Sequence, residues 1–573
     1  MNDPHVWDRE VDLLVCGAGA GGMSAAIVAA QEGLEVLVCE KTSQVGGTTA
    51  TSGGAIWVPG NHLSRTTAAP DTTEAGRRYL DQEVGTYGDP QVREAFLQHG
   101  PAALEYLERH SEVKLKSNHP YPDYHAEKPG GALGGRTCAP LPFDGRRLGA
   151  DFALLRPPMP EFMVLGGMMV GRDEIKHLVR PWRSWPSFKL ALRLVAQYVK
   201  DRLTHARGTR LLLGNALAGR LLYSLRQKGV EIMVDAPLVE LVRERNDVIG
   251  ALVDVAGKRT RIRARRGVVL ATGGCAASAR WRAAEVKDRA IPHALALEGA
   301  SGDGLDAGIA AGGAINRNHS TPFFWMPASI MRWPDGRVAT YPHIRDRPKP
   351  GLIAVNAAGK RFVNEGNSYH DFVAAMFDSD ESVRTIPAYL VCDRDFVRDY
   401  GLGVVHPVWQ WLPKYLRAGY LVSASTLEEL AQSIGVDPQG LVESIDDHNR
   451  AAREGVDRAF GKGSLALNRH NGDPDNKPNP CLRPIVRAPF FALAVHPAPL
   501  GSSVGLHTNA HAQVLDEHGN PIAGLYACGN DMSSVMGGAY PGPGITLGPA
   551  LVFGYCAAMH AAGKAVAQAR LAA

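Results

Sequence analysis

A glycine-rich turn near the amino terminus constrains the fold of this chain more than any other segment. The apolar run 11–16 leads directly into Gly17-Ala18-Gly19-Ala20-Gly21-Gly22, and a helical segment, 23–31, follows. A second apolar run, 35–40, ends on the acid Glu40. A strand, a G-x-G-x-x-G turn, a helix and a second strand that ends in an acid make up the βαβ unit that binds dinucleotides.

Each glycine of this turn has a separate task. Gly17 permits the tight turn, Gly19 lets the backbone approach a pyrophosphate, and Gly22 lets helix and strand pack closely. The helix amino terminus attracts the phosphates, and Glu40 would accept the hydroxyls of the ribose. The predicted cofactor contacts here are Gly17, Ala18, Gly19, Ala20, Gly21, Gly22, Glu40 and Lys41. This unit alone leaves open whether the dinucleotide is NAD or FAD.

A second segment of small residues, 46–54, favours FAD. It follows Glu40 closely, where NAD enzymes usually continue with another βαβ unit. Small residues with hydroxyl groups suit a backbone that lies along a large planar ring and its ribityl chain. A flexible linker is the alternative, but it fits poorly beside the apolar run 55–58. The predicted contacts here are Gly47, Thr48, Thr49, Ser52, Gly53 and Gly54.

This arrangement resembles the FAD-binding segment of the fumarate reductase and ketosteroid dehydrogenase group of flavoproteins. The strand that ends in Ala-Thr-Gly-Gly at 271–274 is similar to their second FAD-contacting strand, and 521–530 resembles their G-L-Y-A-x-G segment. In succinate dehydrogenases a histidine binds FAD covalently at the position that matches Gly47, so the resemblance implies non-covalent FAD. The remaining predicted contacts are Leu238, Thr272, Gly273, Gly529, Asn530, Thr546 and Leu547.

Because these FAD segments lie far apart in the sequence, the domain that holds them must be discontinuous. We predict an α/β fold with a Rossmann-like two-dinucleotide-fold FAD-binding domain and an inserted α+β catalytic (cap) domain. The first domain would comprise residues 1–285 and return at 491–573, and the cap would comprise 286–490. A chain of 573 residues with 45% apolar side chains is large enough for both cores.

Composition excludes several classes of partner. A net charge of +4 over this length gives no reason to expect nucleic acid. The eight cysteines are scattered and form no C-x-x-C pair, which argues against a disulfide framework, a haem attachment site or an iron–sulfur cluster. Neither a signal peptide nor a membrane-spanning run is visible, so a cytoplasmic location is expected.

Two further segments admit a second interpretation. His507 and His511 have the spacing of a zinc site on a helix, but their segment reads as a strand, so no metal is expected. A mixed basic and apolar segment predicts at most peripheral membrane contact, and a solvated helix face is the favoured interpretation. That segment contains Arg180, Trp182, Arg183, Trp185, Leu192, Arg193 and Lys200.

The segment 537–549 is the second unusual turn. Four glycines and two prolines within eight residues exclude a regular helix or strand, and an apolar helix follows from Ala550. Tyr540 is the ionisable side chain of this turn, and the free donors near it include the amide of Gly544. A phenol and an amide at the mouth of a helix could polarise a carbonyl group. A surface loop is the alternative.

Two departures from fumarate reductases indicate a different reaction. The proton-delivering arginine of those enzymes, four residues beyond the R-F-x-N-E pattern at 361–365, is replaced by Tyr369. Their substrate-binding arginine corresponds to Ile545, and a dicarboxylate would bind poorly without it. The turn at 539–544, together with Tyr124 and Tyr369, instead resembles the 3-ketosteroid dehydrogenases.

This resemblance implies a mechanism. Tyr540 and the Gly544 amide would bind the C3 carbonyl of a 3-ketosteroid, Tyr369 with Tyr124 beside it would take the C2 proton, and a hydride would leave C1 for flavin N5. An external electron acceptor would reoxidise the flavin. The predicted substrate pocket consists of Phe323, Phe324 and Tyr121. The alternatives are desaturation at C4–C5, a fumarate-reductase-like reductase of an unsaturated acid, and a flavoprotein that binds FAD without turnover.

Overall fold

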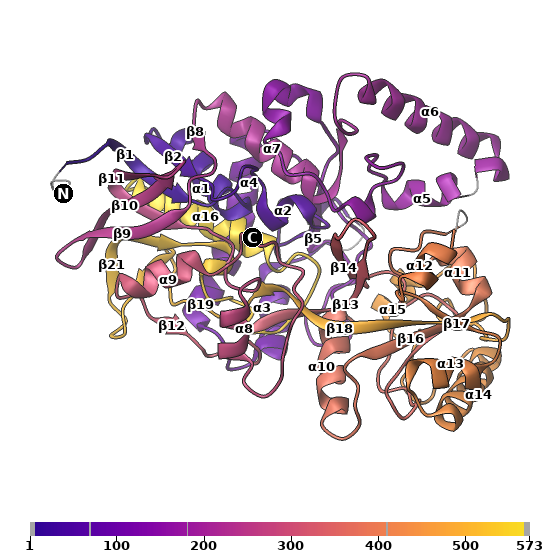
Figure 1. Cartoon of the computed structure of the whole chain (residues 1–573). Helices are drawn as coiled ribbons and strands as arrows, with labels where there is room; N and C mark the ends of the chain where they lie inside the picture. Colours follow the sequence, from indigo (N-terminus) through magenta and orange to yellow (C-terminus); the bar gives the residue numbers. More distant parts are fainter. Residues whose placement is uncertain (1–5, 68–69, 180, 408–410, 567–573) are drawn as a thin grey trace.

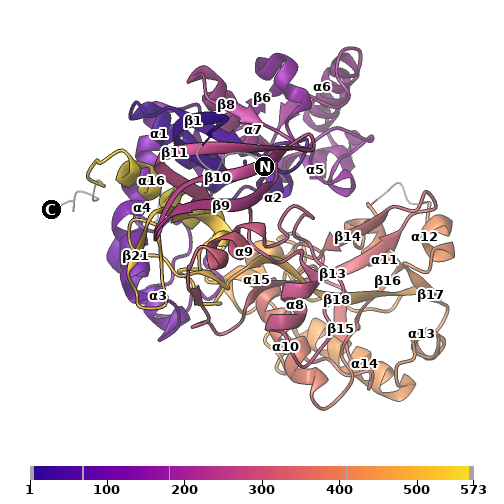
Figure 2. The same cartoon turned by 60° about the vertical axis from the view of Figure 1, so that its left-hand side comes forward.

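The computed structural model describes residues 6–67, 70–179, 181–407 and 411–566 (Figure 1). Arg180, which belongs to the mixed basic and apolar segment described above, lies outside these ranges. Two large sheets organise the described residues, each with its own hydrophobic core. Figures 1 and 2 place them side by side.

The first sheet is the predicted dinucleotide-binding sheet. Its central strands run parallel, as the buried apolar runs of α/β proteins do. Its order is β20 (Gln513–Leu515), β21 (Pro521–Ala527), β11 (Lys258–Leu270), β1 (Arg9–Cys16), β2 (Val36–Cys39) and β8 (Glu231–Met233), with β10 (Asp247–Val255) and β9 (Leu238–Glu244) extending from β11. Strands far apart in sequence therefore share one sheet, as a discontinuous domain requires.

Apolar helices cover this sheet. The helix α1 (Ala20–Gln31) packs on α16 (Leu547–Ala561), and almost every residue of both is buried. Further helices around this part of the chain are α2 (Gly47–Thr51), α3 (Thr73–Val84), α4 (Pro90–His110), α7 (Leu213–Gln227) and α9 (Asp303–Ala310). A small sheet of β3 (Ile56–Trp57), β5 (Thr137–Pro140) and β4 (Leu115–Ser117) stands beside the amino end of α16.

The second sheet is antiparallel and lies in the inserted part of the chain. Its order is β14 (Val338–Pro342), β13 (Phe323–Arg332), β18 (Phe490–Ser502), β16 (Ala388–Asp393) and β15 (Leu352–Val355), and β17 (Val422–Ala424) also pairs with β18. Its helices are α8 (Ala279–Glu285), α10 (Tyr369–Asp380), α11 (Arg394–Tyr400), α12 (Pro413–Arg417), α13 (Leu427–Ile434), α14 (Pro438–Glu454) and α15 (Ala466–Asn471).

The strand pairing shows which segments join each sheet, and the predicted limits of the cap, 286 and 490, stay a prediction. Strand β18 pairs with β13, β16 and β17, so the second sheet reaches Ser502 rather than residue 490. At the other limit, α9 packs on β9, and β12 (Ile315–Asn316) pairs with β19 (Gly505–Leu506), so 303–316 lies with the first sheet. The apolar composition of β18, which is buried along most of its length, suits either core, and its sequence therefore did not reveal which sheet it joins.

The segment that precedes Tyr369 is more irregular than a hairpin. Residues 360–365 form no strand and make a single bridge, between Val355 and Arg361. Arg361 donates to both oxygens of Glu365 and also to Asp457, and these buried ion pairs fix a turn there. The turn delivers the chain to Ser368, whose hydroxyl caps α10. Tyr369 is thus the first residue of a well-anchored helix.

Candidate active site

The glycine turn has the geometry of a nucleotide cradle. Gly17 has φ +111°, and a Cβ there would lie 2.2 Å from the Ala271 carbonyl oxygen. A Cβ on Gly22 would lie 1.9 Å from the Gly17 oxygen, so both positions need glycine for packing. At Gly19 a Cβ would meet nothing closer than the Thr49 hydroxyl, at 3.9 Å. The backbone at Gly19 therefore faces open space, where a phosphate could approach.

The segment 46–54 forms a short helix against this turn. Thr49 accepts a hydrogen bond from the Ala20 amide at 3.1 Å, and the Gly46 amide donates to the Ala18 oxygen. Ser52 donates to the Thr49 oxygen and accepts from the Gly54 amide, so its hydroxyl holds the local backbone. Thr49 and Ser52 thus shape the cradle through the backbone, and their direct contact with a cofactor stays a prediction.

Other predicted cofactor segments converge on the same turn. A Cβ on Gly21 would lie 3.0 Å from the Cys528 sulfur and 3.4 Å from the Gly529 nitrogen. The buried carboxylate of Asp531 accepts hydrogen bonds from the backbone and hydroxyl of Thr272 and from the Gly274 amide. Asp531 therefore ties the turn after β11 to the turn after β21. Sequence reasoning missed it, although it directly follows the predicted contact Asn530.

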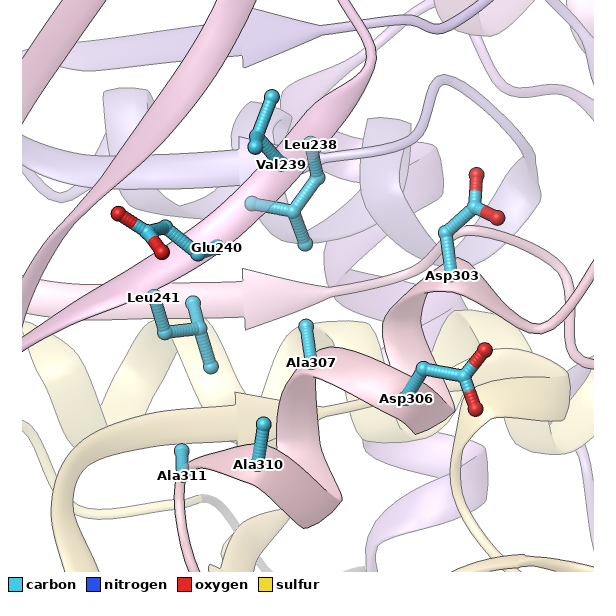
Figure 3. A pocket seen from close by; sticks show the side chains of 9 residues that line it. All are labelled: Leu238, Val239, Glu240, Leu241, Asp303, Asp306, Ala307, Ala310 and Ala311. Carbon is cyan, nitrogen blue, oxygen red and sulfur yellow. The ribbon is translucent and has the colours of Figure 1, made fainter.

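A cavity of about 450 Å³ lies between β9 and α9, near the end of β2 (Figure 3). Figure 3 shows Leu238 on β9 facing α9, with Asp303 and Asp306 at the cavity edge. Lys41 bonds to Asp303 at 2.7 Å. The Glu40 carboxylate accepts from the Ala18 amide at 2.9 Å, which joins the acid of β2 to the glycine turn. The predicted contacts at 40, 41 and 238 thus surround one region beside the cradle.

A substitution at Gly19 would test the cradle. We expect Gly19→Ala to leave the unfolding temperature of the FAD-free protein near that of the wild type, because its methyl group meets open space. The same methyl group should weaken FAD binding by about tenfold or more, since it occupies the approach of the pyrophosphate. Flavin fluorescence titration measures this affinity. The control is Gly299→Ala, where a Cβ would make an ordinary contact at 3.6 Å; equal FAD affinity in the two variants would contradict the prediction.

Three tyrosines from distant segments meet in one cluster. Tyr124 and Tyr540 are stacked, with ring centroids 5.7 Å apart and planes at 13°. The edge of the Tyr369 ring meets both, at 5.5 Å from Tyr124 and 5.0 Å from Tyr540. Tyr124 and Tyr540 both help to raise the pKa of Tyr369. The sequence predicted these three residues as one site, and the structure brings them together.

Burial keeps these phenols protonated in the free protein. It raises the pKa of Tyr124 and of Tyr369 well above the ordinary value, and it raises the pKa of Tyr540 to about 12. The positive charge of Arg347 acts in the opposite direction and lowers the pKa of Tyr124. A tyrosine that takes a proton here therefore needs a nearby cation or a hydrogen-bonded relay.

The turn 539–544 is held through its carbonyl oxygens. The Pro541 oxygen accepts from the Tyr79 hydroxyl at 2.7 Å and from the Tyr124 amide at 2.9 Å. The Gly544 oxygen accepts from the Trp57 amide. The Gly544 amide has no acceptor among the described residues, and at φ +103° a Cβ there would lie 2.5 Å from Ala55. A well-anchored turn thus leaves the Gly544 N–H available four residues after Tyr540.

The aromatic side chains of β13 separate into two groups. Phe324 meets the Tyr540 ring at 5.4 Å, and it shares a narrow cavity with the predicted cofactor residues Gly529, Asn530 and Thr546. Phe323 points to the opposite face of the strand, as neighbours on a strand must, and packs against Trp325 in the core of the second sheet. The structure thus places Phe323 in this core and Phe324 beside Tyr540, and a role for Phe323 in a substrate pocket stays a prediction. Tyr121 lies beside the cluster, with its ring against His470.

Two charged side chains that sequence reasoning missed position the cluster. Arg347 is 1% exposed and donates to the backbone oxygens of His343, Glu365 and Asn367, which fixes the approach to Tyr369. His125 bonds to Glu83 and to Asp371, each at 2.8 Å, and so joins the Tyr124 loop to α10. Burial opposes a charge on His125, but the two carboxylates outweigh it and raise its pKa to about 10. No sequence motif marks either residue.

The arrangement of these parts, a parallel sheet with an open glycine cradle beside a buried aromatic site, defines a dinucleotide-binding oxidoreductase. The model of the FAD binding domain family matches residues 12–547, so the chain belongs to this family and its cofactor is FAD. The open space at Gly19 and the carboxylate of Glu40, directly after β2 and bonded to the Ala18 amide, fit that cofactor.

Three relatives are similar along nearly the whole chain. The chain is 37% identical to the 4-oxocyclohex-2-ene-1-carboxylate 5-dehydrogenase of Sinomonas cyclohexanicum, over 97% of this chain and 94% of that protein. It is 34% identical to the 3-oxosteroid 1-dehydrogenase of Mycobacterium tuberculosis, over 97% and 99%. The structure of the 3-ketosteroid Δ1-dehydrogenase of Sterolibacterium denitrificans with 1,4-androstadiene-3,17-dione superimposes with a TM-score of 0.89, 34% identity and coverage of 97% and 100%. The chain is thus a flavoprotein oxidoreductase that acts on CH–CH groups.

Proposed function

We propose that this protein introduces a C=C bond next to the ketone of a 3-ketosteroid, at C1–C2. The observation that supports this most is the meeting of Tyr124, Tyr369 and Tyr540 beside the free amide of Gly544. FAD, when bound, supplies the acceptor for the hydride that leaves C1. We also propose that FAD is held without a covalent bond, since glycine occupies position 47.

The ketone oxygen would lie between the Tyr540 hydroxyl and the Gly544 amide. Negative charge develops on this oxygen as the neighbouring C2 proton leaves. Both donors sit on a turn whose carbonyl oxygens are already bonded elsewhere, so they need little reorganisation as that charge forms. The C2–H becomes more acidic as a result.

Tyr369 would take the C2 proton, with Tyr124 as its partner. Their rings meet edge to face with centroids 5.5 Å apart, and the proton would be shared between their hydroxyls. Arg347 supplies a cation that favours negative charge on Tyr124, and its guanidinium is held by backbone oxygens. The buried site excludes water from the path.

A second substrate class comes from the relative that acts on 4-oxocyclohex-2-ene-1-carboxylate, a one-ring ketone with a carboxylate. Such a substrate would need a cation in the pocket. The described ring neighbours of Tyr540 are Tyr124, Tyr369, Phe324 and His370, and burial lowers the pKa of His370 to about 4, so it is neutral. Arg347 donates to backbone oxygens. These uncharged aromatic walls favour the multi-ring ketone.

An anaerobic titration tests the proposal. Adding 4-androstene-3,17-dione to the FAD-loaded protein should bleach the flavin absorbance. This ketone already has its C4–C5 double bond, so bleaching would exclude C4–C5 as the bond oxidised. Parallel titrations use 4-oxocyclohex-2-ene-1-carboxylate and succinate. If only the one-ring acid bleaches the flavin, the substrate is a one-ring keto acid and not a steroid. Bleaching by succinate would support the fumarate-reductase-like alternative.

Replacement of Arg347 should change the pH profile of flavin reduction. In Arg347→Met the loss of the cation should raise the apparent pKa for reduction by about one unit, because negative charge on the tyrosine pair is no longer favoured. Arg347→Lys keeps the charge and should restore most of the original profile. A slower reaction with an unchanged pH profile in Arg347→Met would reduce Arg347 to a purely structural role.

A further inference from the structure

The helix α6 (Trp185–Arg202), with the turn η4 (Pro181–Arg183) before it and α5 (Arg172–Val179) beside it, stands at the outer edge of the molecule in both views (Figures 1 and 2). Three large apolar side chains of α6 and one on each side of the helix are exposed to water. The exposed fractions are 81% for Trp182, 65% for Trp185, 57% for Leu192, 56% for Val199 and 80% for Leu203. Large apolar side chains that gather at one place on a surface mark a binding face.

These side chains form one stripe. Trp185, Leu192 and Val199 are spaced by seven residues, which places them on the same face of a helix. Phe188 stacks between Trp182 and Trp185, with ring centroids 5.1 and 5.6 Å apart. The aromatic end of the stripe is therefore an ordered platform. We call this stripe, together with the basic residues Lys189, Arg193 and Lys200 that flank it, the α6 face.

The basic flank consists of Lys189, Arg193 and Lys200, all exposed. None of the three makes an ion pair with a described residue. The acid of α6, Asp201, is buried and accepts from the Thr209 amide at 2.8 Å, so it does not neutralise the flank. The α6 face thus combines apolar side chains with unpaired positive charge.

We propose that the α6 face binds the surface of a membrane that contains anionic lipid, with α6 lying in the plane of the interface. Apolar side chains that enter the acyl region and cations that meet lipid phosphates are the two components of such binding. Among the described helices none is long and apolar enough to cross a membrane, so α6 would lie on the bilayer.

Charge argues against a second copy of the chain as the occupant. A two-fold contact through this face would set Lys189, Arg193 and Lys200 of one copy against the same residues of the other. An anionic surface has the complementary sign. The proposal goes beyond the proposed reaction and does not depend on it, although an apolar ketone would dissolve in the same bilayer.

Co-sedimentation of the FAD-loaded protein with vesicles tests the proposal. Wild type should sediment with phosphatidylcholine vesicles that contain phosphatidylglycerol, and much less with phosphatidylcholine alone. For the triple variant Trp185→Ser, Leu192→Ser, Val199→Ser, the partition coefficient onto these vesicles should fall by about tenfold or more. The matched control is Trp411→Ser, Val456→Ser, Val486→Ser, which removes exposed apolar side chains from the other sheet's surface and should sediment as wild type does.

A charge variant separates the two components. Lys189→Gln, Arg193→Gln, Lys200→Gln should remove the preference for phosphatidylglycerol, and added salt should do the same to wild type. Equal sedimentation of wild type and the α6 triple variant would overturn the proposal. So would dimerisation of wild type that the triple variant abolishes without lipid, because the face would then be an interface between copies.

Discussion

Replacing Tyr369 by phenylalanine is expected to slow turnover by about 10²- to 10⁴-fold, the usual contribution of a positioned acid–base group. Tyr369 contacts both other tyrosines, and its hydroxyl is the atom proposed to accept the substrate proton. The ring itself is 9% exposed and packs edge-on against Tyr124 and Tyr540, and phenylalanine keeps that packing. Binding of FAD and of the steroid should therefore persist.

Single-turnover flavin reduction measures this effect directly. The control is Tyr389→Phe, at the start of β16, because that side chain packs in a separate apolar cluster. The control should keep the wild-type rate. If Tyr369→Phe also reduced flavin at nearly the wild-type rate, Tyr369 would not be the base, and Tyr124 would be the next residue to test.

Replacing Glu365 by glutamine is expected to lower the free energy of unfolding by about 3–5 kcal/mol, as breaking a buried ion pair does. Glu365 is fully buried and accepts two bonds of 2.8 Å from Arg361, and Lys462 lies 3.5 Å away. Glutamine would leave two buried cations facing a neutral amide. The matched control is Glu443→Gln, whose partner Lys360 is half exposed, with an expected change below about 1 kcal/mol.

The pH dependence of the Glu365 contribution follows from its pKa. Burial opposes its charge, but Arg361 and Lys462 outweigh that and lower the pKa to about 2. A carboxylate with a lowered pKa stabilises the fold above its unfolded value of about 4.5, and this stability is lost as the pH falls toward 2. Denaturant unfolding at pH 7 and pH 3 should therefore differ less in Glu365→Gln than in wild type. An equal difference in both proteins would contradict this assignment.

Local sequence patterns predicted the dinucleotide-binding part of the fold well. The strand, turn and helix at 11–31 lie where the glycine spacing placed them, because glycine positions impose backbone geometry directly. The sequence carries less information about where the second sheet begins and ends. Strand β18 is apolar enough for either core, and its partners β13 and β16 are more than 90 residues away in the sequence. The apolar periodicity of a strand does not show which distant strand it pairs with.

The residues of the candidate site likewise fall into those that the sequence predicts and those that it does not. The three tyrosines and Gly544 could be predicted because they resemble a known pattern. Arg347, His125 and Asp531 could not, since each acts by bonding to segments distant from it in the sequence. The sequence could not show which of Phe323 and Phe324 contacts Tyr540, because this depends on which face of β13 is turned toward the tyrosines. Motifs thus identified the groups proposed to react and missed those that hold them.

The junction between the two sheets has a mechanical consequence. The chain passes to the second sheet at Pro322 and returns at Ser503, and the amides of Ser503 and Val504 both donate to the Pro322 oxygen. Strands β13 and β18 therefore leave the second sheet at the same place. Tyr369 begins α10, which packs on β13, whereas Tyr124 and Tyr540 come from segments outside that sheet. The tyrosine cluster consequently depends on how the second sheet is seated, and a shift of α10 would move the Tyr369 hydroxyl away from the other two while the glycine turn kept its place.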